Sequence, residues 1–219
     1  MAKKQFGVIG LGKFGSSVAR HLERLGYPVL AIDKDMSLVE EIKDDVSFAE
    51  VVEATDPEAL AAAGIKNCDT VVVAIGDVQS NILVSLVLQE LGIKNIIVKV
   101  SSKIHGRVVQ KIGIKDIVFP EQDMGVRIAN KIASTNILDY ISISKEFDLV
   151  EYKAVKKLEG ATLKELSLRN RFGITVIAVK RDSSVIVSPS ADEKILEGDT
   201  LFLVGKTEDI KRFEKEYAK

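Results

Sequence analysis

The sequence contains a single cysteine, Cys68, among its 219 residues. One cysteine excludes an intramolecular disulfide and provides no set of thiols for a cysteine-rich metal cluster. Such cysteine usage fits a reducing compartment, so we expect a cytoplasmic protein. Cys68 stands just before an apolar run that begins at Thr70, and we interpret it as a small core residue.

A strong charge of either sign is also lacking. Lys and Arg number 31 and Asp and Glu number 32, so the formal net charge is −1. The field of the whole protein therefore gives no reason to expect a nucleic-acid partner.

Long hydrophobic runs are missing as well. The longest nearly uncharged apolar stretch, residues 71–92, is interrupted by Gly76, Asp77, Asn81 and Gln89. No basic segment followed by an apolar one opens the chain. We therefore expect neither a membrane span nor an export signal. With 46% hydrophobic and 29% charged residues, the composition predicts a soluble globular chain with a sizeable core.

The sequence does contain short apolar runs that alternate with helical patterns. Runs rich in Val and Ile are typical of strands covered on both faces, and they fall at residues 6–10, 28–33, 70–76, 95–100 and 116–120. Amphipathic segments lie between them, over residues 14–25, 82–91 and 104–112. Strict alternation implies right-handed crossovers and a parallel sheet. We predict an α/β fold whose first 120 residues form a Rossmann-like, doubly wound parallel sheet.

The pattern changes after Pro120. Apolar residues then recur near helical spacing, at Met124, Ile128, Ile132 and Ile137. This spacing indicates one long crossover segment that connects or dimerises.

From about residue 146 the pattern is mostly β, with helices expected to begin at Thr162 and Thr207. We predict an N-terminal domain with a crossover helix over residues 1–135 and a smaller α+β C-terminal domain over residues 136–219. Because the second domain is small for a core that stands alone, we expect it to dock or dimerise.

A glycine motif links the first two predicted strands. Gly10, Gly12 and Gly15 form G-x-G-x-x-G between a strand and a helix, and Asp33 ends the next strand. The first glycine allows a tight turn, the second lets the backbone approach a phosphate, and the third lets the helix pack on the strand. Asp33 is placed to accept hydrogen bonds from a ribose diol, and an acid there disfavours a 2′-phosphate. We predict a nucleotide site in preference to a purely structural turn.

Further charged positions leave the kind of nucleotide open. Lys13 could reach a terminal phosphate, which a dinucleotide does not possess, or could be a solvated lysine. Glu121 and Asp123 follow a strand, where they could hold a divalent cation beside phosphates or cap the next helix. Asp77 follows another strand and could contact an adenine or a ribose.

The sequence shows no evident catalytic constellation. His21 is expected on a helix surface, His105 is expected to cap a helix or face solvent, and neither has an evident partner. An oxidoreductase needs a substrate domain that supplies an acid or base near the nicotinamide, and the β-rich remainder offers none. We therefore expect a protein that is not an enzyme, although a Rossmann-like fold alone does not decide function.

Several motifs in linked order resemble one family over nearly the whole chain. They are FGVIGLGKFGSSVARHLERLGYPVLAID, DTVVVAIGD, NIIVKV, IGIKDIVFPEQDMGVRIA, LSLRNRFGITVIAVKR, VIVSP and EGDTLFLVG. This order is similar to that of the regulatory subunits of Ktr and Trk potassium-uptake systems. Those subunits pair an N-terminal RCK (regulator of potassium conductance) domain with a C-terminal RCK subdomain. The single RCK unit is most similar to the Ktr type, since Trk-type subunits usually carry two.

This resemblance implies a regulatory subunit. Members of the family form dimers that assemble into a ring, here expected to be octameric, and the ring docks on a membrane-embedded potassium-translocating subunit. The protein would then be cytoplasmic and peripherally associated with the inner face of the cell membrane. In the family, ATP and ADP compete for the N-terminal crevice and favour different ring shapes. A ligand that binds both shapes equally shifts nothing, so the γ-phosphate must make the difference.

The resemblance also implies which residues hold the ligands. It assigns phosphates to the three glycines of the motif, the ribose to Asp33, and a divalent cation such as Mg²⁺ to Glu121. The family commonly has arginine where this chain has Lys13, and lysine keeps the charge but loses the bidentate fork. The implied nucleotide-site residues are Gly10, Gly12, Lys13, Phe14, Gly15, Asp33, Lys34, Asp56, Ile75, Gly76, Asp77, Lys99 and Glu121.

Many relatives of this type bind cyclic di-AMP at a two-fold interface of the C-terminal subdomain, which lowers transport. The matching positions are Arg169, Ile174, Thr175 and Pro189. An arginine suits a phosphate that bridges two subunits, although Arg169 and Arg171 could simply form a surface cluster.

Alternatives stay open at this level. An NAD(H)-binding Trk-type regulator would share every nucleotide-site residue named above. An NAD-dependent oxidoreductase would show turnover with some substrate. A scaffold with a vestigial nucleotide site would activate its transporter without Asp33.

Overall fold

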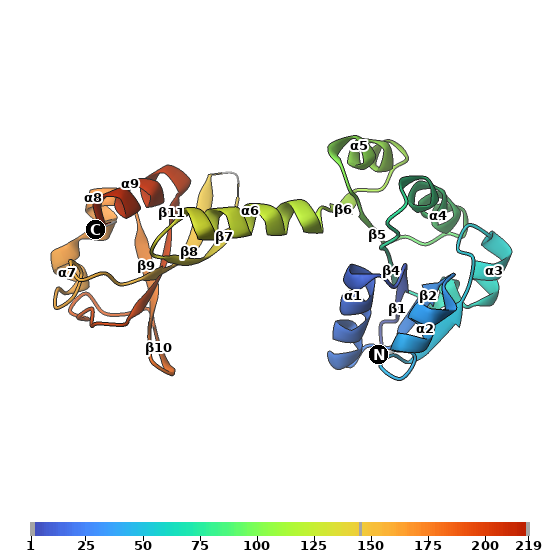
Figure 1. Cartoon of the computed structure of the whole chain (residues 1–219), viewed down its shortest axis with the longest axis horizontal. Helices are drawn as coiled ribbons and strands as arrows, with labels where there is room; N and C mark the ends of the chain where they lie inside the picture. The colour runs from blue at the N-terminus through green and yellow to red at the C-terminus, as the bar shows by residue number, and fades with distance from the viewer. Residues whose placement is uncertain (1–2, 145, 218–219) are drawn as a thin grey trace. The chain divides into compact units, whose positions relative to one another are not determined.

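The computed structural model describes residues 3–144 and 146–217 (Figure 1). The chain divides between residues 122 and 123 into two compact units, each with its own sheet.

The first unit is built on a six-stranded sheet in the order β3-β2-β1-β4-β5-β6, with every neighbouring pair parallel. The order reverses between β1 and β4, and ligands of such sheets bind beyond the carboxyl ends of the strands at that reversal. The predicted Rossmann-like fold is confirmed. The strands are β1 (Phe6–Ile9), β2 (Val29–Asp33), β3 (Phe48–Val51), β4 (Thr70–Val73), β5 (Ile96–Lys99) and β6 (Asp116–Val118).

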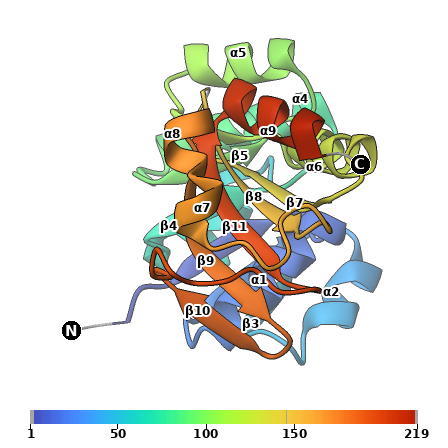
Figure 2. The same cartoon turned by 90° about the vertical axis from the view of Figure 1, so that its left-hand side faces the viewer.

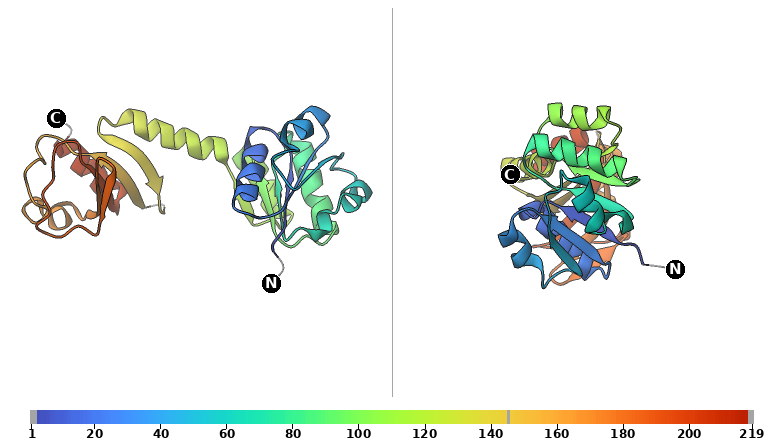
Figure 3. Two further views of the ribbon diagram at one scale, coloured as in Figure 1. Left: turned by 90° about the horizontal axis from the view of Figure 1, so that it is seen from below. Right: turned by 90° about the vertical axis from the view of Figure 1, so that its right-hand side faces the viewer.

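Helices cover both faces of this sheet (Figure 3). One face packs α1 and α2 around a core that includes Val8, Ala19 and Ile42, and the other packs α3, α4 and α5 around Leu60, Val84 and Val109. The helical bounds are α1 (Lys13–Arg24), α2 (Met36–Ile42), α3 (Pro57–Ala62), η1 (Ile65–Asn67), α4 (Val78–Glu90) and α5 (Lys103–Lys111).

Helix α1 forms as its sequence pattern predicts. Phe14, Val18 and Leu22 pack against the buried face, and the helix ends at Arg24. Gly26 follows with φ +84°, a left-handed conformation that glycine adopts without steric cost.

The second unit contains a five-stranded antiparallel sheet in the order β10-β9-β11-β8-β7. Its core holds Tyr152, Phe172 and Phe213 in edge-to-face contacts. Helices α8 and α9 contact each other on this unit (Figure 2). Helix α6 (Pro120–Ala133) begins in the first unit and continues into the second. The other elements of the second unit are β7 (Ile137–Ser142), β8 (Phe147–Lys153), α7 (Leu163–Leu166), α8 (Leu168–Phe172), β9 (Thr175–Arg181), β10 (Ser184–Val187), β11 (Thr200–Lys206) and α9 (Thr207–Tyr217).

The helix predicted at Thr162 is present and carries a complete capping box. The Thr162 hydroxyl accepts from the Glu165 amide at 3.2 Å, while the Glu165 carboxylate accepts from the Thr162 amide at 2.7 Å. The predicted crossover pattern is wrong at its last member, because Ile137 begins strand β7 and is not part of α6. The Ser134 hydroxyl accepts from the Ile137 amide at 2.9 Å, and this turn separates helix from strand.

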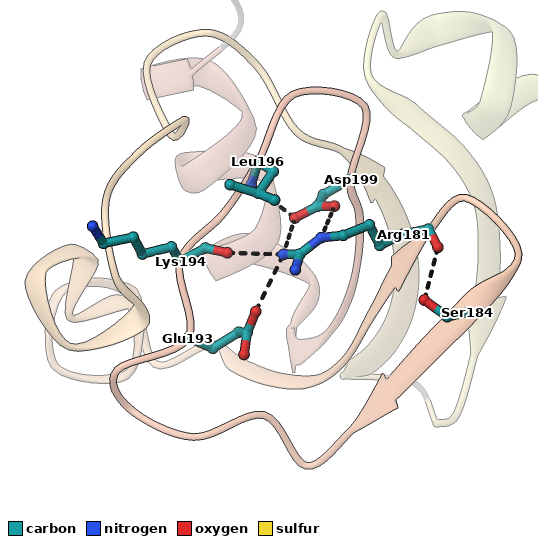
Figure 4. A network of polar contacts seen from close by, with 6 residues as sticks. All are labelled: Arg181, Ser184, Glu193, Lys194, Leu196 and Asp199. Atoms are coloured by element: carbon teal, nitrogen blue, oxygen red, sulfur yellow. Dashed lines mark hydrogen bonds and ion pairs between the residues drawn. The ribbon is translucent and has the colours of Figure 1, made fainter.

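A polar cluster in the second unit fixes the loop before β11 (Figure 4). The Arg181 guanidinium on β9 donates to both carboxylate oxygens of Asp199, each at 2.9 Å, and to the Lys194 carbonyl at 2.9 Å. Glu193 accepts from the same guanidinium at 3.2 Å, and the Leu196 amide donates to Asp199 at 2.8 Å. The Asp199 side chain is 0% exposed, so Arg181 neutralises a carboxylate that is shielded from water.

Candidate functional site

The glycine turn after β1 is closely packed at its first and third glycines. Gly10 has φ +95°, and a Cβ there would lie 2.8 Å from the Ile75 amide nitrogen. A Cβ on Gly15 would lie 1.8 Å from the Gly10 carbonyl oxygen, too close for any side chain. A Cβ on Gly12 would have no neighbour within 4 Å. The middle glycine thus faces open space, where a ligand can approach the backbone.

Helix α1 begins without a side-chain cap. Its N-cap residue, Gly12, offers no side chain for a hydrogen bond, so the amides of the first turn are free to bind an anion. The helices α2, α3, α4 and α5 begin differently: a side chain accepts from their leading amides, supplied by Asp35, Asp56, Asp77 and Ser102. Of these five helices, α1 is thus the one whose positive dipole end is left for a ligand phosphate.

Asp33 ends β2 beside this turn and is half-buried. Its Oδ2 accepts from the Leu11 amide at 2.6 Å, and its Oδ1 accepts from the Asp35 amide at 2.9 Å. These bonds fix the plane of the carboxylate, and each oxygen keeps a lone pair for a further donor. A ribose diol is a suitable donor for such a carboxylate.

Lys99 and Glu121 meet near the start of α1. Lys99 ends β5, and its Nζ lies 2.6 Å from Glu121 Oε1 and 5.8 Å from the centre of the Phe14 ring. The hydrogen bond from Lys99 lowers the pKa of the Glu121 carboxyl below its usual value. The Lys99 side chain is 17% exposed and that of Glu121 is 68% exposed, so this cation and anion stand at the rim of the site.

The structure gives several other predicted site residues structural roles. Asp56 caps α3 by accepting from the Glu58 amide at 2.9 Å, and Asp77 caps α4 by accepting from the Ser80 amide at 2.8 Å. The bond from Ser80 lowers the pKa of Asp77, and the charge of Lys34 lowers it further. Gly76, which follows β4, and Lys13, which begins α1, are exposed, whereas Ile75 is half-buried.

The predicted metal ligand, Glu121, belongs to no cluster of metal-binding side chains among the described residues. Within residues 3–144 and 146–217, no three His, Cys, Asp or Glu side chains lie close enough together to hold a metal ion. Mg²⁺ is often held by one carboxylate together with ligand phosphates, and Glu121 would offer such a single carboxylate. It does not fit a cage made of protein groups.

Sequence reasoning missed a buried polar cluster beneath the site. The interpretation of His105 as a cap or solvent-facing residue is wrong, since His105 is 3% exposed and its Nε2 lies 3.1 Å from Asn81 Oδ1. Asn81 in turn donates to the backbone carbonyls of Ile75 and Lys99. The sequence did contain a signal for this cluster. Asn81 and Ser85 lie at the helical spacing that places them on the same buried face of α4 as Val84 and Leu88.

The candidate cyclic di-AMP residues are only partly accessible. Arg169 on α8 and Thr175 on β9 are exposed, and Pro189 is half-buried. Ile174 as a whole is 1% exposed and belongs to the core of the second unit, so in this structure it offers almost no surface to a ligand. Arg171 has another role, because its guanidinium donates to the Tyr217 hydroxyl at 2.9 Å.

Taken together, an uncapped glycine turn on a doubly wound sheet and a separate small antiparallel unit have the layout of an RCK protein. The TrkA-N domain family matches residues 6–120, and the TrkA-C domain family matches residues 149–218. The Ktr system potassium uptake protein C of Bacillus subtilis is 45% identical over 97% of each chain, and protein A of that system is 41% identical over 97% of this chain and 96% of that one. The chain belongs to the family of Ktr-system potassium uptake proteins, which confirms the resemblance seen in the sequence.

A solved structure supports the same fold. The RCK domain of GsuK matches 98% of this chain and 46% of its own chain, with a TM-score of 0.52 and 22% identity. At that identity the likeness concerns the fold alone. Among the residues that the structure describes, no helix combines the length and the apolar character needed to cross a bilayer.

Proposed function

We propose that this protein is a nucleotide-sensing regulatory subunit of a Ktr-type potassium transporter and that ATP and ADP bind at the glycine turn. One observation carries the proposal: the uncapped start of α1 and the fixed carboxylate of Asp33 stand side by side, joined by the Leu11 amide. Backbone amides would hold phosphates, and Asp33 would hold the ribose. Bound in this way, the nucleotide would regulate a membrane-embedded potassium-translocating subunit from the inner face of the membrane.

The groups at the rim give this site a means of distinguishing a triphosphate from a diphosphate. Lys13, Lys99 and Glu121 supply two cations and one anion around the first turn of α1. A γ-phosphate near Glu121 would be repelled unless a divalent cation lay between them. ATP with a cation and ADP would therefore make different contacts, which is the differential affinity that a switch between two assembly shapes requires.

Self-association is part of the proposal. No residue of α6 is buried within the described chain, and four apolar side chains on it, Met124, Val126, Ile128 and Ile132, are each at least half exposed. Covering them with a second copy of the chain would remove a large apolar area from water. We infer dimers that assemble into an octameric ring, with exposed Arg169 available for cyclic di-AMP at a two-fold interface.

Calorimetric titration with ATP, ADP, NADH and cyclic di-AMP, with and without Mg²⁺, tests the ligand assignment. Asp33→Ala should lower affinity for adenine nucleotides about 10- to 100-fold, the effect of losing hydrogen bonds to a charged acceptor. Asp192→Ala, at an exposed position in the second unit, is the matched control and should bind as the wild type does. A strong preference for NADH would overturn the ATP/ADP assignment, and turnover of a substrate would overturn the regulatory one.

A second variant tests the role of the cation. Glu121→Gln keeps the shape of the side chain and removes its charge, so ATP should no longer need Mg²⁺ to bind tightly. We expect the ratio of ATP affinities with and without Mg²⁺ to fall about tenfold relative to the wild type, which corresponds to about 1.4 kcal/mol. The ratio for ADP serves as the internal control and should change less. An unchanged ATP ratio would exclude Glu121 from the cation site.

A further inference from the structure

The buried polar residues of the first unit form a single cluster. Among the described residues of this unit, only Asn81, Ser85 and His105 are both polar and fully buried, at 0%, 0% and 3% exposure. Hydrogen bonds join all three. Ser85 Oγ donates to the backbone carbonyl of Asn81 at 2.7 Å, and His105 Nε2 lies 3.1 Å from the side-chain oxygen Oδ1 of Asn81. Burying polar groups is costly unless they are satisfied, so such a cluster requires a reason.

The cluster joins the ends of two adjacent strands. Asn81 Nδ2 donates to the Ile75 carbonyl at 3.0 Å and to the Lys99 carbonyl at 3.1 Å. Ile75 follows β4 and packs against the turn at Gly10, whereas Lys99 ends β5 and extends its ammonium toward Glu121. One buried amide group therefore sets the spacing between two segments that line the candidate nucleotide site.

The hydrogen bonds define the protonation state of His105. The Ser101 amide donates to Nδ1 at 3.3 Å, so Nδ1 is an acceptor and the proton of the neutral ring resides on Nε2. Nε2–H then donates to Asn81 Oδ1, which orients both Nδ2 hydrogens toward the two carbonyls. A proton added at Nδ1 would displace the bond from the Ser101 amide and leave the Ser101 hydroxyl, 3.4 Å away, to turn and accept it, so the loop before α5 must rearrange.

Within the part of the chain that the structure describes, no charged side chain forms a hydrogen bond or ion pair with the His105 ring. Asn81 contacts the ring from α4 and Ser101 contacts it from the loop that precedes α5, while the Ser102 hydroxyl accepts from the backbone amide of His105. Burial is the cause that lowers the pKa of the ring, and no charged side chain among the described residues contributes to that shift. Protonation therefore opposes the closed arrangement of the cluster.

We propose that Asn81 is a positioning residue for the nucleotide site and that neutral His105 holds it in the binding geometry, so that protonation of His105 weakens nucleotide binding. This inference rests on the proposed function. The sign follows from linkage: because the closed cluster binds one proton fewer than the opened one, raising the pH favours the closed, binding-competent state. Affinity is complete above the ordinary pKa of histidine, about 6.5, and is lost as the pH falls below it.

The test is the pH profile of ADP affinity for the full chain between about pH 8 and pH 5.5. For one proton, the limiting loss is about tenfold in affinity per pH unit. His105→Gln cannot titrate and should flatten this part of the profile. The sequence has two histidines, and His21→Gln, which changes the exposed one on α1, is the matched control that should keep the wild-type profile. The titration of ADP itself is common to all three proteins and cancels in the comparison.

A second pair of variants separates positioning from stability. Asn81→Ala removes the donor to the Ile75 and Lys99 carbonyls. Ser85→Ala removes a bond of the same cluster that contacts neither of these two segments. Both variants should lower the melting temperature, but Asn81→Ala alone should weaken ADP binding, by about tenfold, the cost of about 1.4 kcal/mol for misplaced contacts. Folded fractions measured by circular dichroism correct the affinities for any unfolding.

The possible results distinguish failure of the inference from failure of the proposed function. If wild-type protein binds ADP and His105→Gln keeps the same pH profile, the inference is wrong and the proposed function stands. If the wild type binds no adenine nucleotide, the proposed function fails and the inference fails with it. Should His105→Gln not fold, an NMR titration of His105 in the wild type decides, because bound ADP must lower the pKa of the ring by reciprocity. An equal or higher pKa in the ADP complex would overturn the inference.

Discussion

Gly15→Ala should lower the free energy of unfolding of the first unit by about 3 kcal/mol, the upper part of the range for forcing an atom into a packed site. The added methyl group would lie 1.8 Å from the Gly10 carbonyl oxygen and 3.1 Å from the Ala74 Cβ. Because the nearest atom is backbone, the turn or the helix must shift. Urea titration monitored by hydrogen exchange of peptides from residues 3–122 measures this loss.

Gly12→Ala is the matched control, since it adds the same methyl group earlier in the same turn. A Cβ at Gly12 would have no neighbour within 4 Å, and its φ of −63° suits alanine. The unfolding free energy should therefore change by less than about 0.5 kcal/mol, as at other sites without packing contacts. Nucleotide affinity should still fall, because the methyl group projects into the space proposed for phosphates. Equal destabilisation by the two variants would contradict this account of the turn.

Arg181→Met should destabilise the second unit by about 3 kcal/mol, the cost of leaving a buried carboxylate without its partner. Asp199 would lose two charge-assisted hydrogen bonds while its side chain remained 0% exposed. Arg212→Met is the control, because the Arg212 side chain is 62% exposed and its pair with Asp209 should contribute less than about 1 kcal/mol. Differential scanning calorimetry compares the two variants, and a loss as small as that of the control would refute the role of Arg181.

The same pair predicts the acid sensitivity of this unit. Burial alone would raise the pKa of Asp199, but the bonds from Arg181 and the Leu196 amide lower it overall. The folded pKa is thus below the unfolded value of about 3.9, so the stabilisation is present above that pH and is lost as the pH falls below it. In Arg181→Met burial would raise the pKa of Asp199 above the unfolded value, so this loss should disappear and lowering the pH should instead restore part of the stability.

Much of the first unit follows from its sequence, because strands buried on both faces have a distinct composition. The runs that contain β1, β2, β4 and β5 are apolar for this reason, whereas β6, at one edge of the sheet and without a buried residue, was found from the apolar run that contains it. Strand β3 lies at the edge of the sheet, where Phe48 and Val51 are exposed, so no apolar run marks it. Edge strands depend on pairing with one neighbour, which a sequence pattern does not record.

The candidate site was only partly predictable, for a related reason. The glycines and Asp33 follow a spacing that local backbone geometry imposes, so the sequence indicates them directly. Asn81 and His105 are 24 residues apart, and they meet only because β5 lies beside β4 and brings α5 next to α4. A histidine near a helix start is more often a cap or a surface residue, and only the packing shows otherwise.

The two hydrogen bonds that the Asp33 carboxylate accepts from backbone amides would limit any redesign of the ligand preference proposed for this protein. Accepting a 2′-phosphate would require exchanging the acid for a neutral or basic residue. That exchange would also remove the acceptor for the Leu11 amide in the glycine turn and for the Asp35 amide before α2. A change of cofactor specificity therefore needs at least one compensating substitution that restores an acceptor, and a single replacement at position 33 will not achieve it.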